Sequence, residues 1–168
     1  MKNFLVILCL ISVTSNLFVF KSGIDQKLLL EDAKENNFFF NENILNNINY
    51  DYPNLSINSV PILTYLSRYD TNKGDFKSAI EKISISLKHN PYSLYSKYLL
   101  SRNYIYINDF KNSEAILESL YNLSPRIESS TSLYFFILGE NKNTSKLIEH
   151  RDMLANIDNY NIWSFYLD

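Results

Sequence analysis

Apolar residues are concentrated first in one run near the start of the chain. The run extends from Phe4 to Phe20, follows the basic Lys2, ends at Lys21 and contains a few polar positions between residues 12 and 16. A helix needs roughly 17–25 apolar residues to cross the hydrocarbon layer of a bilayer, so the run lies at the lower edge of that range. We therefore predict that residues 1–21 form a transmembrane anchor or a signal peptide, with residues 4–20 in contact with the membrane.

Two features of this segment indicate whether it is cleaved and how it is oriented in the membrane. A cleaved signal peptide needs small residues at a cleavage site after a short apolar core. Ser12 and Thr14 meet that need, but the apolar run continues past them to Phe20, which favours an uncleaved anchor. The α-amine and Lys2 before the run favour an N-terminus inside the cytoplasm. We predict a membrane-anchored chain with its other residues extracytoplasmic, in the periplasm; the alternative is secretion to the periplasm.

Beyond residue 60 the apolar and polar positions repeat. "GDFKSAIEKISISLKHNP" begins at Gly74 and "NDFKNSEAILESLYNLSP" begins at Asn108, which is 108 − 74 = 34 positions later. In both stretches apolar residues recur at helical spacing after an Asp-Phe pair. Each stretch ends at a Pro, which disfavours helical backbone at the residue before it. We predict two units, 60–93 and 94–127, each made of a helix, a turn and a second helix.

The flanking segments give weaker patterns. Residues 128–157 predict a degenerate third unit with helices over 130–138 and 144–155 and Asn143 as an N-cap. Residues 158–168 are expected to cap the apolar end of a domain that spans 59–168. Residues 24–52 predict an N-terminal helical pair, whose first helix begins at Asp25, or a loose tether.

The two units resemble the tetratricopeptide repeat (TPR) family. The resemblance rests on the 34-residue period, the Asp-Phe pair, the closing Pro and four small residues at fixed places: Ser67, Ser101, Ala79 and Ser113. It implies an all-α fold, an α-solenoid of antiparallel helix-turn-helix repeats whose helices approach closely at the small residues. It also implies a role in binding other proteins. The pattern departs from the family at Lys97, where the family has a bulky apolar residue.

A second resemblance covers about residues 52–125. The stretches "YPNLSINSVPILTYLSRYD" and "NPYSLYSKYLLS" are similar to the repeat tail of bacterial O-antigen ligase or polymerase-like membrane proteins. This similarity implies an extracytoplasmic domain near surface-glycan assembly. Those enzymes carry their chemistry in a many-helix membrane part, whereas this sequence has one apolar run, so the transferase activity does not carry over. An accessory or detached tail of such an enzyme remains the alternative function.

Composition and charge argue against several other functions. The chain has 168 residues and a net charge of −2, so no basic surplus points to nucleic acid. The single Cys9 excludes an internal disulfide and a Cys-based metal site. His89 and His150, expected at helix ends or on the surface, have no partners at a catalytic spacing. We therefore expect no cofactor, no metal and no enzymatic activity.

The TPR resemblance further implies a groove lined by the first helix of each unit. Arg68 and Arg102 hold the same place in the two units, so their guanidiniums, flanked by phenols, would suit a carboxylate, an acidic peptide or a phosphorylated glycan. The predicted partner is another protein with an acidic or carboxylate-bearing segment. The alternative is that each arginine pairs with a nearby Asp70 or Asp75. The predicted partner-binding positions are Tyr65, Arg68, Asn72, Tyr95, Tyr98, Leu99, Arg102 and Tyr106.

These patterns together predict a non-enzymatic interaction or scaffold domain. It would be tethered to, or exported across, a bacterial membrane and associated with surface-glycan (O-antigen) assembly. The "FFF" at residues 38–40 is expected to pack internally, with docking on a membrane partner as the alternative.

Overall fold

The computed structural model describes residues 2–51 and 54–157 of the chain. These residues form helices and connecting turns, with one isolated β-bridge between Leu55 and Pro61. The all-α expectation is thus confirmed for the described residues, and the predicted cap at 158–168 lies outside them. The chain divides into two compact units, residues 1–93 and 94–168. The helices are α1 (Lys2–Lys34), α2 (Glu42–Asn46), α3 (Ile62–Lys73), α4 (Phe76–His89), α5 (Leu94–Tyr106), α6 (Phe110–Leu123), α7 (Glu128–Glu140) and α8 (Thr144–Ile157).

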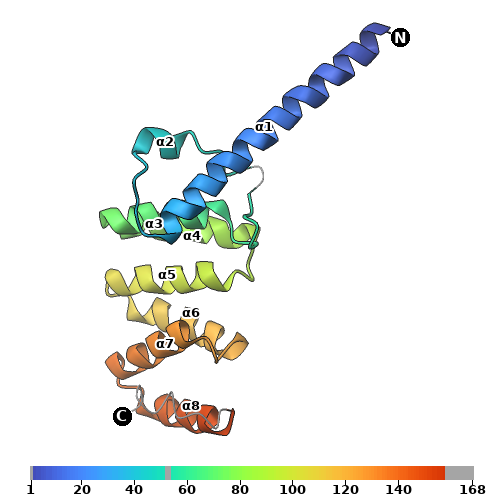
Figure 1. Cartoon of the computed structure of the whole chain (residues 1–168). Helices are drawn as coiled ribbons and strands as arrows, with labels where there is room; N and C mark the ends of the chain where they lie inside the picture. The colour runs from blue at the N-terminus through green and yellow to red at the C-terminus, as the bar shows by residue number, and fades with distance from the viewer. Residues whose placement is uncertain (1, 52–53, 158–168) are drawn as a thin grey trace. The chain divides into compact units, whose positions relative to one another are not determined.

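The first unit contains one unbroken helix, α1, where the sequence predicted a new helix at Asp25. Figure 1 shows the C-terminal part of α1 beside α3. A lone glycine such as Gly23 costs about 1 kcal/mol inside a helix. Full burial of Leu29 and Ala33 in the same helix outweighs that cost, since one buried leucine stabilises by about 2 kcal/mol. The helix therefore runs from the apolar segment directly into the packed unit.

The chain reverses direction after α1 through a small polar and aromatic cluster. The Asp32 carboxylate accepts hydrogen bonds from the Phe39 backbone N–H at 3.1 and 3.2 Å and from the Tyr69 hydroxyl. The Phe38 ring meets the Tyr69 ring edge-on, with 5.2 Å between ring centroids. Of the predicted aromatic plug, Phe38 thus packs internally, whereas Phe39 is 79% exposed.

The turn between α3 and α4 has the geometry that its sequence requires. Gly74 ends α3 in the left-handed conformation, with φ of 81°, which glycine adopts without steric cost. Asp75 then caps α4, because its side chain accepts a hydrogen bond from the Ser78 N–H at 3.1 Å. The small residues Ser67 and Ala79 are fully buried in this pair of packed helices.

Replacing Asp75 with alanine is expected to lower the free energy of unfolding by about 1 kcal/mol, because the cap hydrogen bond is lost. For a chain of this size the melting temperature should fall by about 3 °C. Thermal unfolding followed by circular dichroism measures the change. Asp75→Asn is the matched control, since asparagine is an equally good cap, and an equal loss in both variants would contradict the capping role.

The second unit is built around the pairs α5–α6, α6–α7 and α7–α8. Asp109 caps α6 as Asp75 caps α4, by accepting from the Asn112 N–H at 3.2 Å. Helices α7 and α8 confirm the two helices predicted for residues 128–157. Between them Asn143 Oδ1 accepts from the Lys146 N–H at 3.4 Å, the predicted capping contact. The core cluster of buried residues consists of Leu117, Leu120, Tyr121, Tyr134, Phe135, Ile137 and Leu138.

The prediction that His150 lies at a helix end or on the surface was wrong. His150 lies within α8 and is buried against Tyr121 and Tyr134, with ring centroids at 4.6 and 5.5 Å. Its Nε2 lies 3.4 Å from the Tyr134 hydroxyl, and its Nδ1 has no hydrogen-bond partner among the described residues. The aromatic residues that bury it come from two other helices, which the local pattern around residue 150 does not reveal. His89, by contrast, is the exposed last residue of α4, as predicted.

The burial of His150 predicts a pH-dependent stability. Burial lowers the pKa of His150 below its ordinary value of 6.5, and this effect outweighs the opposing influence of Glu149 and Glu118. As pH falls through 6.5, the unfolded chain takes up a proton that the folded unit resists, so the free energy of unfolding should fall. Denaturant unfolding between pH 7.5 and about 5.5, compared with His150→Gln, measures this. An identical pH dependence in the variant would contradict the assignment.

Candidate interaction site

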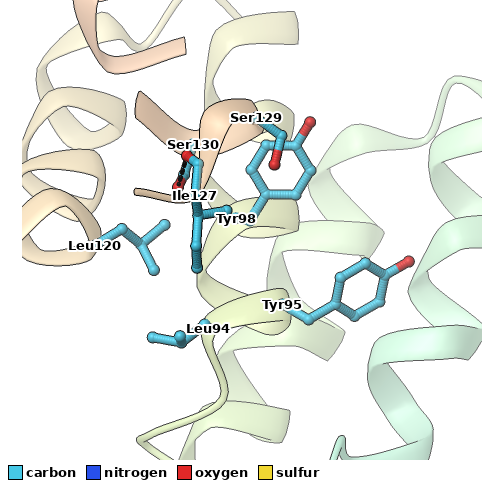
Figure 2. A pocket seen from close by; sticks show the side chains of 7 residues that line it. All are labelled: Leu94, Tyr95, Tyr98, Leu120, Ile127, Ser129 and Ser130. Carbon is cyan, nitrogen blue, oxygen red and sulfur yellow. Dashed lines mark hydrogen bonds between the residues drawn. The ribbon is translucent and has the colours of Figure 1, made fainter. Parts of the chain in front are cut away.

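A half-open hollow lies in the second unit, among helices α5, α6 and the start of α7. Its volume is about 230 Å³. Figure 2 shows the side chains of Leu94, Leu120 and Ile127 on one side and the rings of Tyr95 and Tyr98 on the other, with both phenol oxygens directed away from the aliphatic groups. The residues that line it are Leu94, Tyr95, Tyr98, Leu120, Ile127, Ser129 and Ser130.

The walls of the hollow are fixed by packing and by local hydrogen bonds. Leu120 belongs to the buried core, and Leu94 and Tyr98 pack against that core. At the start of α7 the Ser130 hydroxyl donates to the Ile127 carbonyl oxygen at 3.1 Å, which holds the turn that presents Ile127. Ile127 itself remains 39% exposed. The hollow is therefore a preformed apolar site whose rim is open to solvent, which suits one or two aliphatic side chains of a ligand.

A guanidinium lies directly beside this hollow on α5. Arg102 is one turn from Tyr98 and one turn from Tyr106, and its Cζ lies 5.7 Å from the centroid of each ring. One of its N–H groups donates to the Tyr106 hydroxyl at 2.6 Å. Since Tyr98 also lines the hollow, the cation and the apolar site share a wall.

The Arg102 group is held as a cation. Burial acts to lower the pKa of Arg102, but the hydrogen bond to Tyr106 and the electrostatic interactions with both phenols outweigh burial and raise it. A guanidinium carries five N–H donors in a planar fork. None of the ion pairs among the described residues involves Arg102. The fork is therefore preorganised by two phenols and carries donors for a carboxylate.

Four of the five predicted site residues on α5 meet here, and Tyr106 is the last residue of that helix. Tyr95 and Tyr98 line the hollow, and Tyr98 and Tyr106 flank Arg102. Leu99, the aliphatic residue also expected in the groove, is buried. Sequence spacing on a single helix was sufficient to bring these side chains together, because residues four apart share one face.

The predicted positions of the first unit have different surroundings. Tyr65 is buried at 7% exposure, and Asn72 is exposed. Arg68 donates to the Asn36 side chain, and its Cζ lies 5.5 Å above the Phe38 ring. Arg68 therefore holds the turn after α1 against α3.

Asp70 and Asp75, the alternative partners predicted for Arg68 and Arg102, have other roles. Asp70 forms an ion pair with Lys82 at 2.7 Å and accepts from the Ser78 hydroxyl at 3.0 Å. Asp75 caps α4.

Several lining residues were not predicted from the sequence. Leu120 lies on the second helix of its unit, Ile127 is the last residue of that unit, and Ser129 and Ser130 lie in the degenerate third unit. Extending the 34-residue period from Leu94 and Tyr95 by one unit reaches residues 128 and 129. The period alone therefore indicated that residues near the start of α7 could line the site.

Among residues 2–51 and 54–157, no group of three or more His, Cys, Asp or Glu side chains is placed to hold a metal ion.

Comparison of the chain with protein-family models, with curated proteins and with solved structures found no match.

Proposed function

We propose that this chain is a non-enzymatic protein-interaction module held at a bacterial membrane, and that its second unit binds an acidic, aliphatic segment of another protein. The observation that carries the proposal is the Arg102 guanidinium between Tyr98 and Tyr106, beside the apolar hollow of about 230 Å³. The recurring helix pairs with capped turns further support TPR-like repeats. Surface-glycan assembly is the setting that the sequence resemblance suggests.

The chemistry of the site favours a segment with both apolar and acidic side chains. An aliphatic side chain in the hollow would cover carbon surface of Leu94, Leu120 and Ile127. A neighbouring carboxylate would accept from the Arg102 fork, and charge-assisted hydrogen bonds of this kind are about twice as strong as neutral ones. Tyr95 and Tyr98 add rigid contact area with few rotatable bonds, so little conformational entropy is lost on binding.

The membrane part of the proposal rests on α1. The stretch from Asn3 to Lys34 contains an 18-residue window with mean hydropathy 2.1 and none of that window buried. The large apolar side chains between Phe4 and Phe20 are all exposed by 45% or more. Such a helix is compatible with a membrane anchor or a signal sequence. We propose the anchor, with the packed units in the periplasm, because α1 continues without a break into its contact with α3.

A panel of fluorescent peptides tests this function on the full chain in nanodiscs. The peptides carry Leu and Ile with Asp or Glu, and matched peptides replace the acids by Asn or Gln, or by Lys. Fluorescence anisotropy should show saturable binding for the acidic peptides, weaker binding for the neutral peptides and none for the basic ones. Affinity should decrease with added salt, because the Arg102 charge supplies part of the attraction and salt screens charges near the solvent. Equal binding of all three sets would contradict the proposal.

A further inference from the structure

A second hollow lies in the first unit, where α1 leaves its apolar segment. It is an open hollow lined by residues of α1, of the short α2 and directly after α2, and its volume is about 260 Å³. The side chains that line it are Lys21, Asp25, Asn43, Ile44, Asn47 and Ile48. It belongs to a different unit from the interaction site on α5, and it shares no residue with that site.

The sequence determines where this hollow lies along α1 relative to the apolar run. Lys21 directly follows Phe20, the last residue of the apolar run. Burial against the protein begins with Ser22 and Gln26, which are 4% and 6% exposed, whereas Phe20 is 68% exposed. Once residues 4–20 span the hydrocarbon layer, the hollow therefore lies at the level of the lipid headgroups.

The hollow carries one positive and one negative group in a fixed order. Lys21 and Asp25 are one helical turn apart, so Asp25 lies about 6 Å farther along α1 from the apolar run than Lys21. Neither residue takes part in the ion pairs found among the described residues; the α1 pair joins Lys27 to Glu31, and Glu42 of α2 pairs with Lys73. The cation thus lies nearer the hydrocarbon layer and the anion lies nearer the water.

We propose that this hollow binds the headgroup of an aminophospholipid such as phosphatidylethanolamine. In such a lipid the phosphate is attached to the glycerol and the primary ammonium lies farther out, so the two charges follow the same order as Lys21 and Asp25. The Lys21 ammonium would bind the phosphate, and the Asp25 carboxylate would accept hydrogen bonds from the lipid ammonium. Ile48, which is 5% exposed, and Ile44, which is 44% exposed, supply carbon surface for the linking methylene groups.

Charge complementarity distinguishes this ligand from other lipids. A trimethylated ammonium, as in phosphatidylcholine, has no N–H to donate to Asp25, and an anionic glycerol headgroup places no cation there. Lys21 alone would attract any lipid phosphate, as a lysine at the end of a membrane helix does. Asp25 is therefore the residue that selects the amine. This inference rests on the membrane anchor of the proposed function and is independent of peptide binding on α5.

Native mass spectrometry of the full chain, released from nanodiscs of stated composition, tests the proposal. Nanodiscs contain equal parts of phosphatidylcholine and phosphatidylethanolamine, or of phosphatidylcholine and phosphatidylglycerol. The wild type should retain phosphatidylethanolamine over phosphatidylcholine by about fivefold, the size of one exposed ion pair. Asp25→Asn should abolish this preference, and Lys21→Gln should lower retention of both lipids. Lys27→Gln, an exposed lysine of the same helix, is the matched control and should behave as the wild type.

A double variant, Lys21→Asp with Asp25→Lys, tests the order of the charges at constant net charge. It should lose the phosphatidylethanolamine preference. Three results would each overturn the proposal. The wild type could retain all lipids equally, the wild type could prefer phosphatidylglycerol, or the double variant could keep the wild-type preference for phosphatidylethanolamine. The same spectra give the intact mass. A chain that lacks the residues before Lys21 would overturn the anchor as well, whereas an intact chain indifferent to headgroup would overturn only the lipid site.

Discussion

Truncating Leu117 to alanine should destabilise the second unit by about 3 kcal/mol, the largest stability change that we expect from a single substitution. Leu117 is fully buried in the core cluster that α6 forms with α7, so the truncation removes apolar contacts and leaves a cavity. Denaturant unfolding of the full chain in nanodiscs, followed by circular dichroism, measures the loss.

Ile148→Ala is the control for this truncation. Ile148 lies on α8 and is 52% exposed, so its truncation should change the free energy of unfolding by no more than about 0.5 kcal/mol. A similar loss in both variants would contradict the assignment of the core to the face of α6 that carries Leu117.

Reversing the charge of Arg102 should weaken binding of the acidic peptides by at least about tenfold, or about 1.4 kcal/mol. Arg102→Glu removes the cation that lies between Tyr98 and Tyr106 and places a carboxylate opposite the ligand's own acid, and such like-charge contacts cost several kcal/mol. Fluorescence anisotropy with the acidic peptide panel measures the change.

Two variants separate recognition by Arg102 from a general charge effect. Lys111→Glu makes the same change in charge at an exposed position of α6 and should leave the affinity within about twofold. Arg102→Lys keeps the charge but loses the planar fork stacked between the two rings, so its affinity should lie between those of the wild type and Arg102→Glu. Equal losses from Arg102→Glu and Lys111→Glu would show that only net charge matters.

The helices between residues 60 and 127 were predictable from the sequence because their signals are local. An aspartate before each second helix, a glycine or asparagine in the turn and a closing proline act through the backbone of their immediate neighbours. The structure places Asp75 and Asp109 at the N-caps of α4 and α6, and α7 and α8 occupy the positions that weaker patterns predicted.

The continuity of α1 could not be read from local signals. Lys21, Ser22 and Gly23 look like the end of a membrane segment, and Asp25 looks like the start of a new helix. The interactions that override these signals involve residues far along the chain: α1 packs against α3, and Leu29 and Ala33 of α1 are fully buried. Tertiary packing of this kind decides many helix boundaries that propensity alone leaves open.

The candidate site was predictable only where one helix supplies it. Tyr95, Tyr98, Arg102 and Tyr106 lie at successive turns of α5, so helical spacing brought them to one face. The apolar half of the site needs Leu120 from α6 and Ile127 from the turn before α7. Their approach depends on how three helices pack, and the burial of His150 between Tyr121 and Tyr134 depends on the same packing.

Site-specific photo-crosslinking in membranes tests whether the α5 face binds an acidic segment of another protein, as we propose. A photoreactive phenylalanine replaces Tyr95 at the rim of the hollow or, as a control, the exposed Ile148 of α8. We predict one protein partner captured from position 95, through a segment rich in acidic and aliphatic residues. That capture should be absent from position 148 and lost with Arg102→Glu. Identical capture from both positions, or capture that survives Arg102→Glu, would show that the partner does not bind at the α5 face.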